Sequence, residues 1–219
     1  MNKYNGFSLI EMAIALAIIG YLISGLFKPM VLTADYKKIN NTDKTLEQIK
    51  GALVSFAIVN NRLPCPARCT KYKKQCVKGS YNSSVIGIEN SALCTKEGYL
   101  PWADLGVGRY DGWNRPFRYR VDKNYSATNI KINVDKKFTI KNKQSVNNFT
   151  TTSSNRHVIA IIFSYGKDGE PNPKNDTIDL TYISGQYQTD ENDYFDDRLT
   201  WLSKNSLTSY LATTRDLPQ

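Results

Sequence analysis

The sequence has little of what common enzyme sites and repetitive fibres require. It contains one histidine, His157, and neither an HExxH nor a GxSxG string, which removes two frequent classes of hydrolase. Its 13 glycines and 8 prolines are too few for a collagen-like or low-complexity polymer. Hydrophobic residues make up 41% of the 219 positions, too many for a disordered chain. We therefore expect one folded, non-enzymatic domain with an appendage.

The charges are unevenly distributed along the chain. The formal net charge is +9, but residues 62–78 hold six basic side chains and no acid, whereas residues 168–197 hold nine acids and one lysine. Such a bipolar chain favours contact with a partner or a second copy over a uniform nucleic-acid coat. Clustered cations beside Tyr72 can also bind phosphates and stack a base. DNA is therefore retained as a partner that we do not favour.

One long hydrophobic run stands near the N-terminus. Residues 7–27 read FSLIEMAIALAIIGYLISGLF, and Glu11 is the only charge among these 21 residues. As a helix rising about 1.5 Å per residue, the run spans roughly 30 Å, the thickness of a bilayer's hydrocarbon core. A helix that is apolar all round lies in lipid or is packed on every side by other chains. We assign residues 7–29 as a transmembrane and assembly helix.

Three interpretations of this run compete. A secretory signal peptide would be cut after its apolar stretch, but the small residues at 13–17 would place the cut inside the run. A plain membrane anchor explains the length but not Glu11, because a carboxylate deep in a bilayer costs about 2.5–3.5 kcal/mol. Glu11 either serves a function in the membrane or, near the helix start, reaches the headgroups. Composition and position do not decide between these two roles of Glu11.

Beyond the run the pattern becomes amphipathic. Lys28 and Pro29 close the apolar stretch, and proline bends or ends a helix. Farther on, residues that recur every three or four positions form one stripe that a globular head must cover, namely Ile39, Thr42, Leu46, Ile49, Leu53 and Phe56. We expect one helix to run to about Asn60, with residues 30–60 as its amphipathic continuation and Pro64 beyond its end.

The string that ends at Glu11 resembles the processing site of type IV prepilins and of the pseudopilins of type II secretion. It reads Lys3-Tyr4-Asn5-Gly6-Phe7-Ser8-Leu9-Ile10-Glu11, a short basic leader that ends in glycine and meets an apolar run. In that family a membrane-embedded aspartic peptidase cuts after the glycine and methylates the new amine. The resemblance implies a leader of residues 1–6, cleavage between Gly6 and Phe7, N-methylation of Phe7, and Glu11 as the acid used in assembly.

Three further segments resemble the head of a prepilin subfamily, namely Arg62–Pro66, Gly98–Trp102 and Asp111–Tyr119. The resemblance implies an α+β pilin fold, in which the long N-terminal helix packs on an antiparallel β-sheet head. Residues 61–219 would form that head, with an αβ loop at 61–116 and the sheet and C-terminal region at 117–219. Where the family has glycine after the tryptophan of the Asp-x-Trp block, this chain has Asn114, which also tolerates the left-handed conformation.

The β-branched and aromatic runs predict individual strands in this head. They lie at residues 117–121, 129–134, 137–140 and 158–164. Residues 196–203 resemble the closing strand of the same subfamily, and a short helix is expected at 206–212. Residues 144–155 are rich in serine, threonine and asparagine, which predicts a loop.

The four cysteines all fall between residues 65 and 94, outside the apolar run. A head outside the cytoplasm permits disulfides, and four thiols allow three pairings. Zinc is the rival, although spacings of three, six and seventeen intervening residues match no common ligand pattern. The subfamily resemblance implies a bridge between the Leu-Pro-Cys-Pro and Leu-Pro-Trp turns, and hence the nested pairs Cys65–Cys94 and Cys69–Cys76.

An acidic loop begins at Asp168. Oxygen-rich loops suit calcium, and the major pseudopilins have a calcium loop of similar appearance, which makes Asp168, Asp176 and Asp179 the candidate ligands. The spacing is not that of an EF-hand, and Pro171 and Pro173 stiffen the middle. A solvated acidic loop with an Asp-Gly turn is therefore the alternative. No other cofactor is expected.

These patterns predict a type IV pilin-like structural subunit, a pseudopilin or minor pilin, and not an enzyme. The resemblance implies a single-pass protein of the bacterial inner membrane that the prepilin peptidase cleaves. The cleaved chain would join other pilin or pseudopilin subunits at an assembly platform and form a periplasmic or cell-surface filament. The alternative is a monomeric, membrane-anchored periplasmic binding or adaptor protein that keeps its leader.

Overall fold

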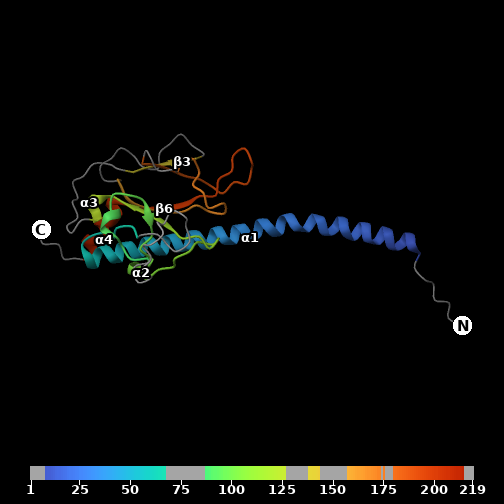
Figure 1. Cartoon of the computed structure of the whole chain (residues 1–219), viewed down its shortest axis with the longest axis horizontal. Helices are drawn as coiled ribbons and strands as arrows, with labels where there is room; N and C mark the ends of the chain where they lie inside the picture. The colour runs from blue at the N-terminus through green and yellow to red at the C-terminus, as the bar shows by residue number, and fades with distance from the viewer. Residues whose placement is uncertain are drawn as a thin grey trace, which may run out of the picture. The chain divides into compact units, whose positions relative to one another are not determined.

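The longest element is helix α1, Leu9–Asn60, which continues without interruption through Pro29 (Figure 1). The computed structural model describes residues 8–67, 87–126, 138–143, 157–173, 175 and 180–214, without the side chains of residues 24–32 and 214. Asn61 follows the helix with a φ of +57°, a left-handed conformation that ends it as expected near Asn60. Of the two expectations for Pro29, a bend or an end of the helix, the end is wrong, because one lost backbone hydrogen bond does not stop the turns around it.

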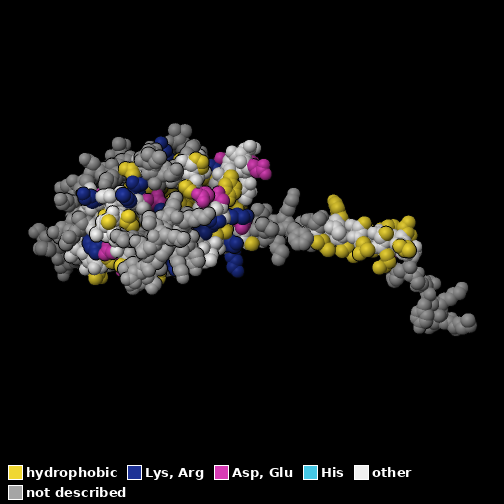
Figure 2. All heavy atoms as spheres, in the orientation of Figure 1, with side chains coloured by type: hydrophobic (Ala, Val, Ile, Leu, Met, Phe, Trp, Pro, Cys, Tyr) yellow, Lys and Arg dark blue, Asp and Glu magenta, His cyan; other side chains and the backbone are white. Residues whose placement is uncertain are grey.

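The chain divides into two compact units, Met1–Lys38 and Ile39–Gln219, so α1 begins in the first unit and ends in the second. In the first unit, large apolar side chains between Leu9 and Ile23 are exposed, from 90% at Leu9 to 46% at Ile23. Figure 2 shows them as a yellow cover on this stretch of α1. Exposed apolar surface of this extent marks a helix made for contact with other molecules.

Among the described residues, no helix is both long enough and apolar enough to cross a membrane.

The second unit, or head, carries a four-stranded antiparallel sheet in the order β1-β2-β4-β6. Its strands are β1 Gly98–Tyr99, β2 Arg118–Val121, β4 Val158–Ser164 and β6 Arg198–Ser203. The strands expected at 117–121, 158–164 and 196–203 are confirmed within two residues. The strand expected at 129–134 and the loop expected at 144–155 both lie outside the described residues.

Four helical segments lie beside the sheets in the described part of the head. Three are single turns, η2 Ser91–Leu93, α2 Trp102–Leu105 and α3 Lys123–Ser126. The C-terminal helix α4, Lys204–Thr214, is longer than the helix expected at 206–212. It packs on the sheet through Leu207, which is fully buried, and Leu211.

A second, two-stranded sheet contradicts the expectation that all strands are antiparallel. Its strands, β3 Thr139–Asn142 and β5 Thr181–Ser184, run parallel, with Ile140 opposite Tyr182. Two strands so far apart in the sequence need no hairpin between them, so a parallel pairing is accessible. The strand expected at 137–140 therefore exists, but it is displaced toward the C-terminus and belongs to this separate sheet.

The two sheets give the head two hydrophobic cores, which share the central strand β4. All seven residues of β4 are buried. On one face, Ile162 joins Tyr119 of β2 and the buried residues of α1. On the other, Ile161 and Phe163 pack with the buried side chains Phe138, Ile140 and Tyr182. Burial on both faces explains why β4 reads as a continuous apolar run.

The stripe predicted on α1 is buried, with one exception, and its residues from Leu46 to Leu53 lie in the first of these cores. Leu46, Ile49 and Leu53 are at most 2% exposed. Phe56, however, is only half-buried, and Ala57 takes the buried position on the next turn. The Arg62 guanidinium lies 5.5 Å from the centre of the Phe56 ring, so that ring contacts a cation at the helix edge.

Polar contacts fasten the C-terminal half of α1 to the edge strand β6. Arg198 donates to both carboxylate oxygens of Asp43, at 2.8 and 2.7 Å. One turn farther along, the Thr200 hydroxyl donates to Glu47 Oε1 at 2.9 Å. A bidentate arginine–carboxylate pair fixes orientation as well as distance. We call these two contacts the α1–β6 clasp.

Candidate functional site

The N-terminal end of α1 places Glu11 in its first turn. The Ser8 backbone N–H donates to Glu11 Oε2 at 2.9 Å, so the carboxylate caps the start of the helix. A negative charge there is favoured because the backbone N–H groups give a helix start a partial positive charge. Gly6 and Phe7, the residues of the predicted cleavage, lie outside the described residues.

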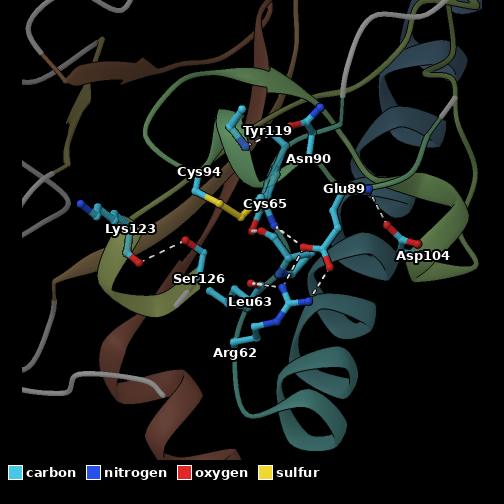
Figure 3. The surroundings of a disulfide bond; sticks show 12 residues. Arg62, Leu63, Cys65, Glu89, Asn90, Cys94, Asp104, Tyr119, Lys123 and Ser126 are labelled. Atoms are coloured by element: carbon cyan, nitrogen blue, oxygen red, sulfur yellow. Dashed lines mark hydrogen bonds and ion pairs between the residues drawn. A yellow bond between two sulfur atoms is a disulfide. The ribbon is translucent and has the colours of Figure 1, made fainter. Parts of the chain in front are cut away.

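A disulfide ties the segment after α1 to the loop before β1 (Figure 3). It joins Cys65 to Cys94, whose Cα atoms are 4.6 Å apart, and it is the outer pair of the predicted nested scheme. Cys65 is 3% exposed. The predicted inner pair, Cys69 and Cys76, lies outside the described residues and stays a prediction.

An ion pair supports the same segment. Arg62 donates to both oxygens of Glu89, at 2.7 and 2.5 Å, and the Cys65 backbone N–H donates to Glu89 Oε2 at 2.9 Å (Figure 3). Hydrogen bonding to Glu89 raises the pKa of Arg62. Burial alone would raise the pKa of Glu89, but the Arg62 guanidinium holds it below its ordinary value. Arg62, the first basic residue of the 62–78 segment, therefore has a structural partner in its own head.

The Asp-x-Trp block forms a turn around a buried carboxylate. Asp111 accepts the backbone N–H groups of Trp113 at 2.9 Å and Arg115 at 2.8 Å, and the Ser164 hydroxyl at 2.5 Å. Asn114 has a φ of +62°, so it supplies the left-handed conformation for which the family uses glycine. The block therefore positions the start of β2, and no role beyond packing follows for Trp113.

The acidic loop after β4 is held by two carboxylates that precede β6. Asp196 Oδ2 accepts the backbone N–H of Asp168 and the Tyr194 hydroxyl, both at 2.9 Å. Asp197 Oδ2 accepts the backbone N–H of Asn172 at 2.9 Å and the side-chain amide of Asn175 at 2.7 Å. These contacts bring two loops together that the sequence separates by more than twenty residues.

The described part of this loop does not form a calcium site. The Asp168 carboxylate turns back to accept the backbone N–H of Glu170 at 2.9 Å. Asp176 and Asp179 lie outside the described residues. Among the described residues, no group of three histidine, cysteine, aspartate or glutamate side chains could hold a metal ion. Calcium binding by Asp168, Asp176 and Asp179 stays a prediction.

Comparison with known proteins decides the nature of the N-terminal end. Residues 1–27 match the family profile described as the prokaryotic N-terminal methylation motif. The chain carries a type IV prepilin signal. No curated protein and no solved structure matches the chain.

The prepilin signal confirms the family predicted from the string that ends at Glu11. The match supports a type IV pilin-like protein that is processed at its N-terminus. Such a signal implies a structural subunit, membrane-anchored before it becomes associated with a pilus.

His157, the single histidine, precedes β4, where its backbone carbonyl accepts the N–H of Lys204 at 2.8 Å.

Sequence reasoning missed the two buried acids that organise the acidic loop. Asp196 and Asp197 are each 3% exposed, and they precede β6 instead of beginning it. Asp197 Oδ1 is buried and has no hydrogen-bond partner among the described residues. Burial raises the pKa of Asp197 to about 7. The only sequence signal is a pair of acids directly before an apolar strand, which is also common on surfaces.

Lowering the pH from 8 to 5 is therefore expected to stabilise the head. An aspartate in an unfolded chain titrates near 3.9, whereas Asp197 titrates near 7 in the folded head. The folded state binds the extra proton between these values, so the free energy of unfolding rises as the pH falls through 7 and levels off near 4. A shift of this size corresponds to at most about 4 kcal/mol. Urea unfolding of the full chain in detergent at several pH values measures it.

Two variants assign this pH dependence. Asp197→Asn should flatten the profile between pH 5 and 8, because it removes the titrating group and keeps an acceptor for Asn172. Glu170→Gln, which changes an exposed acid of the same loop, should leave the slope unchanged. A slope that survives Asp197→Asn would assign the titration to another group, such as Asp111 or Asp196, whose pKa values burial also raises.

Proposed function

We propose that this protein is a pilin-like structural subunit that enters a pilus or pseudopilus through its N-terminal helix. The prepilin peptidase cleaves it between Gly6 and Phe7, Phe7 is N-methylated, and Glu11 pairs with the N-terminus of a neighbouring subunit. The match at residues 1–27, which includes all three residues, is the observation that carries this proposal.

Charge supports the role of Glu11. Cleavage frees an amine at Phe7, which adds a positive charge at the end of a helix that already has a partial positive charge. In a bundle of apolar helices that charge is tolerated only when it is paired. Glu11 is the one acid among residues 7–27, and it lies in the first turn of α1. Pairing between neighbours would therefore set the axial register of the subunits.

The apolar half of α1 supports assembly through the helix. Before assembly, residues 7–29 would lie in the inner membrane, and in the filament they would pack against the helices of neighbouring subunits and of the assembly platform. The exposed apolar side chains from Leu9 to Ile23 fit both environments. The amphipathic half is already covered by the head, so the two halves of one helix serve different contacts.

Coexpression with a prepilin peptidase is expected to yield a chain that begins at Phe7 and carries one extra methyl group. Loss of the leader removes Met1 to Gly6, including the charge of Lys3. N-terminal sequencing and intact mass spectrometry measure both changes, and the same chain expressed without the peptidase is the control. An intact Met1 in the presence of an active peptidase would contradict the proposal. It would favour the alternative, an anchored periplasmic binding or adaptor protein.

A further inference from the structure

The head has an open cavity of about 410 Å³ beside the acidic loop. Its lining includes the apolar residues Pro171, Pro173 and Ile183 and five residues between positions 191 and 196. The volume lies within the range of cavities that bind small ligands or single side chains. All of these residues belong to the second unit.

The cavity is strongly acidic. Among the described residues, one lysine, Lys143, and four acids line it, which gives this part of the lining a formal charge of −3. Lys143 is already engaged, because its Nζ lies 2.8 Å from Asp193 Oδ1 and donates to the Asp193 carbonyl at 2.7 Å. The three other acids are Asp168, Glu191 and Asp196. They give the cavity a negative charge that a cationic guest would neutralise.

Asp196 shows that this charge is not compensated within the described head. Asp196 is 3% exposed, and its donors, the Tyr194 hydroxyl and the backbone N–H groups of Lys167 and Asp168, are neutral groups. No cation pairs with it in the described part of the chain. Burial raises the pKa of Asp196, which is the cost of holding a charge at this place. A cation in the cavity would offset that cost.

The residue types that line the cavity favour a particular kind of cation. Lysine and arginine side chains place an apolar stem on hydrophobic surface and a charged head among polar groups. Proline and isoleucine in the lining suit the stem, and the carboxylates suit the head. A small inorganic cation would use the carboxylates but leave the apolar lining residues without a contact.

The chain itself contains a matching segment. Residues 68–78 hold five basic side chains and no acid, and they lie outside the described residues. We propose that the cavity receives a lysine or arginine side chain from residues 68–78 of a second copy of this chain. A patch that contacts a different patch on the next copy makes a head-to-tail contact, which repeats along a filament. The inference thus rests on the proposed function, since assembly brings the copies together.

A peptide tests the contact without a filament. The probe is residues 68–78 with serine in place of both cysteines and a fluorophore at its N-terminus, added to the full-length protein in detergent. Fluorescence anisotropy should show binding that weakens when sodium chloride is raised from about 50 to about 300 mM, because salt screens charge pairs. A peptide in which Lys73 and Lys74 are replaced by glutamate should bind more weakly.

Two head variants supply the matched comparison. Glu191→Lys and Glu170→Lys change the net charge equally at exposed positions, but only Glu191 lines the cavity. Glu191→Lys should weaken peptide binding by about fivefold or more, since it replaces an attraction by a repulsion. Glu170→Lys should change it less than about twofold. The peptide with glutamate at 73 and 74 should regain affinity for the Glu191→Lys protein.

Several outcomes would overturn the inference. The first is that the basic peptide shows no detectable binding. The second is that Glu191→Lys and Glu170→Lys weaken binding equally, which would indicate unspecific attraction. Displacement of the peptide by calcium chloride at constant ionic strength would identify the cavity as a cation site instead. Each of these results is independent of N-terminal processing, so the docking contact and the proposed function fail separately.

Discussion

Replacing Glu11 by alanine is expected to remove the protein from filaments while leaving its head folded. The variant would bury the Phe7 amine of a neighbour without a partner. Breaking a buried charge pair costs about 3–5 kcal/mol, which corresponds to a loss of incorporation of roughly a hundredfold or more. Quantitative mass spectrometry of sheared filaments and of the membrane fraction measures the ratio.

Two variants separate the charge of Glu11 from its other contacts. Glu11→Gln keeps the side-chain shape and an acceptor for the Ser8 N–H, so a loss equal to that of alanine would assign the effect to charge. Glu170→Ala, an acid in the head, should enter filaments like the unaltered chain. Normal incorporation of Glu11→Ala would show that assembly does not depend on this carboxylate and would refute its assigned role.

Removal of the disulfide is expected to have the largest effect on the stability of the head. Cys65 and Cys94 are separated by 29 residues, and closing a loop of that length stabilises a fold by about 3–4 kcal/mol in the chain-entropy model. The double variant Cys65→Ser, Cys94→Ser should therefore unfold at a lower urea concentration. Unfolding of the full chain in detergent, under oxidising conditions, measures the difference.

The second cysteine pair provides the matched control. If Cys69 and Cys76 form the nested inner bridge, their loop of seven residues is worth about 2 kcal/mol, so the corresponding double serine variant should lose less stability. Non-reducing peptide mapping checks the pairing directly. Linked peptides that join Cys65 to Cys69 and Cys76 to Cys94 would contradict both the nested scheme and the bridge in the structure.

The N-terminal features could be predicted from the sequence because their signals are local. The prepilin signal occupies consecutive residues, and the helix that follows is read from the period of its apolar positions. The end of α1 is marked by residues that follow it, Asn61 and Pro64. Phe56 is the one stripe residue whose burial was predicted wrongly. It lies at the edge of the stripe, where the helical period does not decide between a buried and an exposed position.

The second sheet could not be predicted, because long-range pairing decides it. Strand β5 is only four residues long, and its partner β3 precedes it by about forty positions. A strand was expected at 137–140, near β3, but β5 was not, and nothing in either segment identifies the other as its partner. The continuous apolar run of β4 was the available hint, since a strand covered on one face alternates between apolar and polar residues.

The organisation of the acidic loop could not be predicted from the sequence, for a related reason. Aspartates in a loop are usually solvated, and the sequence offers no sign that Asp196 and Asp197 turn inward. Their burial depends on N–H groups of Asp168 and Asn172, which come from a different loop. Partners of a buried carboxylate are therefore visible only once the two loops are placed together.

The α1–β6 clasp has a mechanical consequence. In the proposed filament a subunit would be held by its helix, so a pull on the head would act along that helix. Asp43 and Glu47 lie one turn apart on α1, and both hold the same strand. Tension along the helix strains both attachments together in shear, in contrast to a peeling geometry, in which bonds break one after another. The head would consequently resist stretching of the fibre better than it resists being lifted away sideways.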